Sequence, residues 1–153
     1  MSSGKRRRER GRSPRVSFRY RRRVQFADTD MIGIVHFSVF LRYMEEAEHA
    51  LWRAAGLTIA RPGDETGWPR LAATVDFKSP LRFEEEFDVG VRIAETTRRS
   101  LRYEFTITRG DTAIATGTIT TAFVSRRPGE PMKALDLPAD IVGKLRVAAE
   151  RSI

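Results

Sequence analysis

The feature that most constrains this chain is a change in apolar spacing between residues 18 and 54. Apolar side chains first alternate with polar ones at Phe18, Tyr20, Val24 and Phe26, which predicts a half-buried strand with arginines on its other face. A polar turn follows, and then apolar residues at helical spacing on two sides predict a long helix that needs cover around it and ends at Gly56. Its main apolar positions are Phe37, Phe40, Leu41, Met44, Ala47, Leu51 and Ala54.

The remainder of the chain has the pattern of β-structure. Alternating segments near residues 71–78, 87–93, 101–107 and 113–124 are separated by turns at 97–100 and 109–112. Residues 138–151 then predict a short amphipathic helix. A strand, a long helix and four antiparallel strands in this order indicate an α+β domain with the helix packed on one face of the sheet.

Length and composition limit the kinds of site that the chain can form. The 153 residues suit one domain, which we place at 16–153, after a tail at 1–15. The absence of cysteine excludes disulfides, thiol nucleophiles and thiolate metal sites. His36 and His49 do not have a recognisable metal-ligand spacing, so we expect no metal.

The tail at residues 1–15 carries most of the basic character. It holds seven Lys and Arg residues against one acid, which accounts for six of the eight net positive charges. Its composition predicts disorder. Contact with nucleic acid or an anionic membrane is conceivable, but arginines without interleaved aromatic residues attract polyanions without reading them, so we expect a solvated extension. With no apolar signal segment and no run near the ~20 residues that span a bilayer, we expect a cytoplasmic protein.

The turn before the long helix holds the most chemistry. Asp28, Asp30, Gly33 and His36 lie immediately before the free N–H groups that open a helix. A carboxylate beside unpaired amides suits acyl transfer, because the carboxylate can attack or activate water while the amides hold an oxyanion. The alternative is that both aspartates only hydrogen-bond the amides of the turn.

The same segment resembles the hotdog-fold acyl-CoA thioesterases of the 4-hydroxybenzoyl-CoA thioesterase group. The resemblance is carried, in the order of that group, by residues 26–37, 40–43, 45–47, 77–83, 98–100 and 133–138. It implies a hotdog fold, in which a curved antiparallel sheet wraps a long central helix and a short helix ends the chain. It also implies an acyl-CoA thioesterase that hydrolyses a small or medium acyl-CoA.

The resemblance assigns roles to individual residues. Asp30 becomes the catalytic carboxylate, as nucleophile or general base, and the backbone N–H of Phe37, at the start of the helix, binds the thioester oxygen. Asp28 becomes structural. Coenzyme A is part of the substrate, so the resemblance implies no separate cofactor. It matches Arg98, Arg99 and Lys133 to the coenzyme A phosphates, which suits their positive charge. Arg82 is a further candidate.

Gly33 and His36 complete the expected substrate site. Gly33 is expected to supply an unusual backbone conformation that leaves space for the thioester. His36 either makes a polar contact in the acyl pocket or only packs. Small changes at four positions would choose among short, aromatic and longer acyl groups: Phe40, Met44, Thr74 and Phe77.

Other readings stay open. A helix glutamate at position 45, 46 or 48 could replace Asp30, although pairing with Arg42 or Arg53 is the simpler role. A hotdog dehydratase or hydratase would use a histidine and an acid. A non-catalytic acyl-CoA or nucleic-acid-binding protein would work through residues 1–23, and removing residues 1–15 would separate it from a thioesterase.

The resemblance and the two apolar sides of the helix both predict a homodimer or homotetramer. In such an assembly each active site is completed by the other subunit, and we expect the long strand at 113–124 to offer the edge that pairs.

Overall fold

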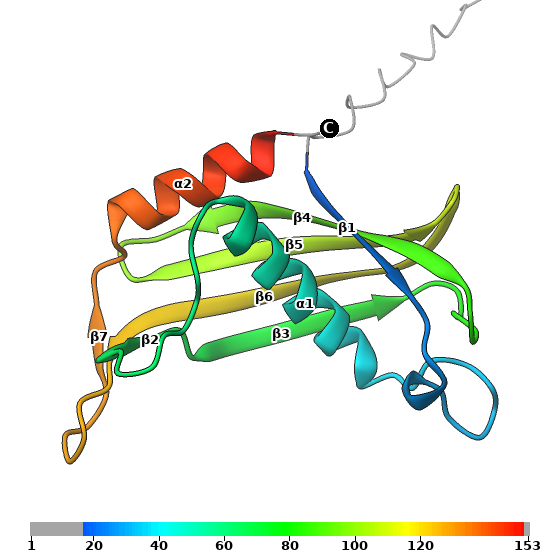
Figure 1. Ribbon diagram of the computed structural model, residues 1–153, viewed down its shortest axis with the longest axis horizontal. Helices are drawn as coiled ribbons and strands as arrows, with labels where there is room; N and C mark the ends of the chain where they lie inside the picture. Colours follow the sequence, from blue (N-terminus) through cyan, green and yellow to red (C-terminus); the bar gives the residue numbers. More distant parts are fainter. Residues whose placement is uncertain (1–16, 152–153) are drawn as a thin grey trace, which may run out of the picture.

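A curled antiparallel sheet with two helices forms the domain in the computed structural model, which describes residues 17–151 (Figure 1). The expected tail at 1–15 lies outside this range. The order is β1 (Phe18–Arg23), 3-10 turn η1 (Phe26–Asp28), α1 (Val39–Ala54), β2 (Thr66–Gly67), β3 (Arg70–Phe77), β4 (Glu86–Thr96), β5 (Ser100–Arg109), β6 (Thr112–Ser125), β7 (Lys133–Leu135) and α2 (Ala139–Glu150).

The sheet confirms the predicted run of antiparallel strands. The main strands lie in the order β1, β4, β5, β6, β3, and the short β2 and β7 pair with the far end of β6. Tight turns join β4 to β5 and β5 to β6, and the second turn contains Gly110 with a positive φ of 56°. The hairpins are therefore where the sequence places them.

Helix α1 crosses one face of this sheet (Figure 1). Its inner side buries Tyr43, Met44, Ala47 and Leu51 against the inward residues of the strands. At Gly117 of β6 the helix comes especially close. A Cβ there would lie 2.6 Å from the Thr74 carbonyl oxygen and 2.7 Å from Met44 Cε, so only glycine fits without a shift.

The expectation of an enclosed helix is met only in part. Helix α1 has 16 residues, and the sheet covers one side of it while Leu41, Arg42, Glu45 and Arg53 on its outer side are exposed. Three of these four exposed residues are charged, whereas Val39 and Tyr43 are buried, so α1 is an amphipathic helix packed on the sheet.

Two predicted boundaries are wrong. Strand β1 ends at Arg23, and Phe26, expected on its buried face, lies in the 3-10 turn with 77% of its surface exposed. Helix α1 begins at Val39, so Phe37 precedes it. In both places polar side chains hold the backbone in turns that apolar spacing does not reveal.

The predicted free edge at residues 113–124 is also wrong, because β6 pairs with β5 on one side and with β3 on the other. Among residues 17–151 the edges of the main sheet are β1, which pairs only with β4, and β3, which pairs only with β6. Most residues of β3 are exposed, including Leu71 at 61% and Phe77 at 54%. In the same range, no helix is both long and apolar enough to cross a bilayer.

Candidate active site

A tight turn at residues 30–34 presents Asp30. The Asp30 N–H donates to the Ile34 carbonyl over 2.9 Å, and the Gly33 N–H donates back to the Asp30 carbonyl over 3.0 Å. Gly33 adopts a φ of +86°, which explains the glycine, although a Cβ there would have nothing within 4 Å. The Asp30 carboxylate accepts the Ile32 N–H at 2.9 Å, so one of its oxygens is held in place while the group stays accessible.

The turn is fixed to the rest of the domain on both sides. Val35 donates its N–H to the Leu81 carbonyl over 2.8 Å, and His36 donates its N–H to the Asp28 carbonyl over 2.9 Å. Ile34 forms an isolated antiparallel bridge with Arg82, the residue that was a further candidate for phosphate. These bonds hold the segment between η1 and α1 at one end of the sheet (Figure 1).

A pocket of about 430 Å³ opens beside Asp30. The Phe40 and Phe77 rings meet edge to face there, with centroids 5.1 Å apart. Thus two of the four residues expected to choose the acyl group line it, whereas Met44 and Thr74 do not. The lining residues are Asp30, Ile34, Val35, Phe37, Phe40, Phe77, Lys78, Ser79 and Pro80.

Phe37 lines this pocket, and its backbone N–H is a candidate donor. The amides on either side of it are engaged, since His36 N–H donates to the Asp28 carbonyl over 2.9 Å and Ser38 N–H donates to His36 Nδ1 over 3.2 Å. Within residues 17–151 the Phe37 N–H itself has no acceptor. A free amide just before a helix N-terminus, where the helix dipole adds positive potential, can bind an oxyanion.

Asp28 is a buried structural residue, 3% exposed. Its Oδ2 accepts from Gln25 N–H at 2.9 Å, from Arg22 Nη1 at 3.0 Å and from the Tyr43 hydroxyl at 2.9 Å. Burial and the bond to Asp28 raise the pKa of Tyr43 well above its usual range, so this hydroxyl remains a donor. The network anchors the backbone from which the Asp30 turn extends.

The helix glutamates pair elsewhere than expected. Glu48 is fully buried and binds Arg70 of β3, as does Glu45, while Glu46 binds Arg22. The expected partners Arg42 and Arg53 are therefore wrong, because the strands facing α1 supply arginines that helical spacing cannot reveal. The acyl pocket has no glutamate in its lining.

The remaining expected substrate residues are dispersed. Gly33 and His36 lie beside the pocket but do not line it. Arg98 and Arg99 occupy the β4–β5 turn, where their bonds to Asp136 lower the pKa of that carboxyl, and Lys133 begins β7. Strand β5, of ten residues, separates this end of the sheet from the Asp30 end by about 30 Å. Within one chain these cations do not reach Asp30.

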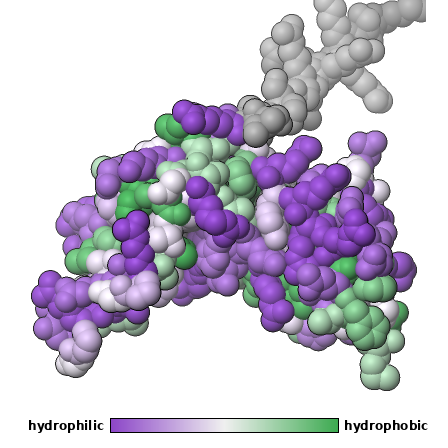
Figure 2. All heavy atoms as spheres, viewed as in Figure 1, coloured by the Kyte–Doolittle hydropathy of each residue, from purple (hydrophilic) through white to green (hydrophobic). Residues whose placement is uncertain are grey.

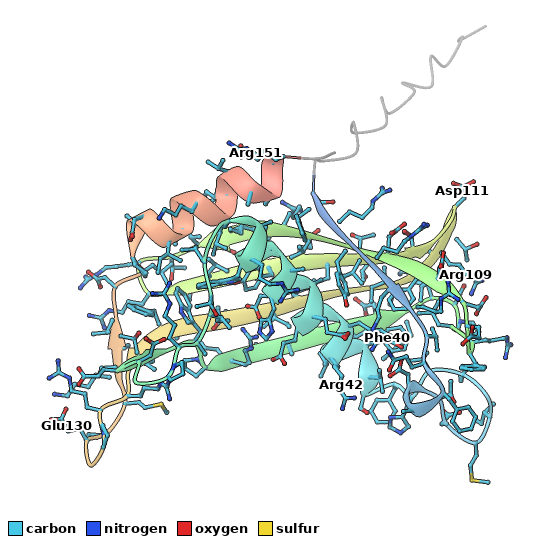
Figure 3. All side chains as sticks on the ribbon, viewed as in Figure 1. Phe40, Arg42, Arg109, Asp111, Glu130 and Arg151 are labelled. Carbon is cyan, nitrogen blue, oxygen red and sulfur yellow. The ribbon has the colours of Figure 1, made fainter. Side chains whose placement is uncertain are left out.

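The figures also distinguish the Asp30 end of the sheet from the end that holds Arg98, Arg99 and Lys133. Figure 3 places Phe40 and Arg42 at the start of α1, at the same end as Arg109 and Asp111, and places Glu130 at the opposite end. Apolar atoms gather at the Asp30 end (Figure 2), where Phe26, Met31, Ile32, Phe37 and Phe83 are exposed.

Comparisons with known proteins agree with the geometry. Residues 24–145 match the family model described as the thioesterase-like superfamily. A relative from Aquifex aeolicus (strain VF5), named "Putative esterase", is 35% identical over 101 residues, covering 65% of this chain and 79% of the relative. A 1,4-dihydroxy-2-naphthoyl-CoA hydrolase from Parasynechococcus marenigrum (strain WH8102) is 34% identical over 89 residues, 52% of this chain and 59% of that protein.

A solved structure gives the same result. The structure of a gentisyl-coenzyme A thioesterase superposes with a TM-score of 0.74 at 25% identity, covering 83% of this chain and 98% of that one. The match to the family model spans most of the chain and includes both the Asp30 turn and the pocket. The chain therefore belongs to the thioesterase-like superfamily and is a thioester hydrolase.

Proposed function

We propose that this hydrolase is an acyl-CoA thioesterase in which Asp30 and the Phe37 N–H act on the thioester carbonyl. The observation that carries the proposal is that one apolar pocket is lined by Asp30 and by Phe37, which lies just before α1 and whose N–H has no acceptor within residues 17–151. An aspartate carboxyl is ionised at neutral pH, so it can attack the carbonyl carbon or take a proton from an attacking water.

In either route the carbonyl oxygen becomes an oxyanion next to the Phe37 N–H, and the coenzyme A thiolate leaves. Water supplies the new oxygen of the acid, and a proton completes the free thiol. The positive end of α1 lowers the energy of the oxyanion more than that of the neutral carbonyl, which is what catalysis requires.

The acyl group is proposed to be small and aromatic. Three aromatic rings line the pocket, those of Phe37, Phe40 and Phe77. Two of the relatives are named for aromatic acyl-CoA substrates, 1,4-dihydroxy-2-naphthoyl-CoA and gentisyl-coenzyme A. A hydratase has no support in this geometry, because His36 does not line the pocket.

Coenzyme A binding is proposed to involve a second copy of the chain. If two β3 edges pair antiparallel about a twofold axis, the start of one strand meets the end of the other. That pairing carries the end of the partner that holds Arg98, Arg99 and Lys133 toward this chain's pocket, where Phe77 ends β3. A homodimer, or a tetramer of two such dimers, follows from this proposal.

The test is a panel of acetyl-, hexanoyl-, benzoyl- and palmitoyl-CoA, with turnover measured by release of free thiol. We expect benzoyl-CoA to be hydrolysed fastest, and Asp30→Asn to lower its kcat by about 100-fold or more because the change removes the charge and keeps the shape. Asp111→Asn, the same change on the exposed β5–β6 turn, is the matched control and should be fully active. Near-normal turnover of Asp30→Asn would remove that residue from the mechanism.

A further inference from the structure

The backbone of His36 is held by hydrogen bonds at both its N–H and its carbonyl group. Its N–H donates to the Asp28 carbonyl and its own carbonyl accepts from Val39 N–H, each over 2.9 Å. The ring is exposed and does not line the acyl pocket, so neither packing in the core nor contact with the acyl group explains it.

The ring instead accepts hydrogen bonds from the residue that precedes α1. Nδ1 lies 3.2 Å from the Ser38 backbone nitrogen and 2.8 Å from the Ser38 hydroxyl oxygen. A backbone N–H can only donate, so Nδ1 must carry a lone pair and the ring proton must be on Nε2. The bond runs from a side chain to the N–H two residues later, which is what aspartate and asparagine make in an Asx turn.

This bond fixes Ser38, the residue from which α1 starts. Ser38 is the N-cap residue of α1, yet its side chain makes no capping hydrogen bond to the helix. The hydrogen bond joins the His36 side chain to the Ser38 N–H, so the ring of atoms that it closes includes the Phe37 backbone. The His36 and Phe37 rings also lie close together, with centroids 4.6 Å apart at 31°.

Building on the proposed function, we infer that His36 is a positioning residue for the oxyanion amide. Its Nδ1 fixes Ser38, which keeps the Phe37 N–H out of helical hydrogen bonding and directed to the pocket. Without this acceptor, the residues before α1 can rearrange, and the Phe37 N–H loses its fixed direction while the acyl pocket remains.

Two substitutions separate the hydrogen bond from the ring. His36→Asn keeps an acceptor that can reach the Ser38 N–H but loses the ring, whereas His36→Phe keeps the ring against Phe37 but loses the acceptor. Because removal of a whole oxyanion donor costs about 100- to 1,000-fold in kcat, we expect His36→Phe to lower kcat by roughly tenfold or more, with KM changed by less than about twofold. We expect His36→Asn to stay within about threefold of the wild type.

The outcomes discriminate. Two kinetic results would overturn the inference: wild-type kcat in His36→Phe, or an equal loss of kcat in both variants. It would also be overturned if His36→Phe were unfolded at the assay temperature but showed normal turnover when assayed cold. If the wild type hydrolyses none of the acyl-CoA panel, the proposed function fails, and the positioning role fails with it.

A second measurement does not depend on turnover. The chain has only two histidines, so a long-range ¹H–¹⁵N spectrum of the imidazoles shows two rings, and the set missing in His36→Asn belongs to His36. A His36 ring with the proton on Nε2 and a bare Nδ1 supports the hydrogen bond. A proton on Nδ1 overturns it even in an active enzyme.

Discussion

Asp28 and Asp30 are two residues apart, and the structure predicts opposite consequences when each is removed. Asp28→Ala would leave the Tyr43 hydroxyl and the Gln25 N–H without their acceptor and would leave Arg22 with Glu46 as its remaining carboxylate partner, at a site that is 3% exposed. Breaking a buried ion pair by removing one partner costs about 3–5 kcal/mol of unfolding free energy. For a domain of this size, where each kcal/mol shifts the melting temperature by about 3 °C, the melting temperature should fall by roughly 10–15 °C.

Asp30→Ala loses one accepted hydrogen bond, from the Ile32 N–H at an exposed turn. Its cost to stability should be about 1 kcal/mol or less. Tyr43→Phe removes one of the three donors to Asp28 and leaves the carboxylate paired with Arg22, so we expect a loss of roughly 1–2 kcal/mol. From most to least stable, the expected order is therefore Asp30→Ala, Tyr43→Phe and Asp28→Ala.

Urea unfolding followed by circular dichroism measures all three variants, and thiol release measures their activity. Asp30→Ala should be folded and inactive, and Tyr43→Phe should be active and less stable. The reasoning is refuted if Asp28→Ala unfolds at the same urea concentration as Asp30→Ala, because the three hydrogen bonds would then contribute nothing to folding.

Other predictions follow from the same geometry. Arg98→Ala, Arg99→Ala and Lys133→Ala should each raise KM for acyl-CoA with little change in kcat, because phosphate contacts bind ground and transition states alike; unchanged KM in all three would place coenzyme A elsewhere. Light scattering of the full chain should give a dimer or tetramer of the 17.4 kDa subunit, and a fully active monomer would rule out a shared site. Gly117→Ala should lower the free energy of unfolding, measured in urea, by roughly 1–3 kcal/mol because its Cβ overlaps α1 and β3. In the control Gly90→Ala, the new Cβ meets a serine hydroxyl that can rotate away. Equal losses of unfolding free energy in the two variants would show that the close approach at β6 is unimportant.

Much of the fold could be predicted from apolar spacing. The alternation at Phe87, Val89, Val91 and Ile93 gives the buried face of β4, and all four side chains are buried. The hairpin at 109–112 is visible because glycine supplies the positive φ that the turn needs. These features depend on residues close in sequence, and local spacing reports them directly.

The polar interior could not be predicted this way. Glu48 lies on the buried side of α1 because Arg70, 22 residues later, reaches it from β3. Arg22 faces inward from β1 because Asp28 and Glu46 accept its hydrogen bonds. Each charge is stable inside only with a partner brought by the tertiary fold, so sequence spacing alone favours a surface position for all of them.

Two features of the single chain support a shared site. Strand β3 leaves one edge unpaired within residues 17–151, and the cations matched to coenzyme A lie about 30 Å from Asp30. The unpaired edge of β3 favours a partner whatever the protein does, since an exposed edge strand with Leu71 and Phe77 on it is prone to pair. The distance between these cations and Asp30 calls for a partner only if coenzyme A is the carrier of the acyl group. Assembly and substrate can therefore be tested apart: a dimer whose KM ignores the three cations would keep the pairing of β3 and reject the phosphate assignment.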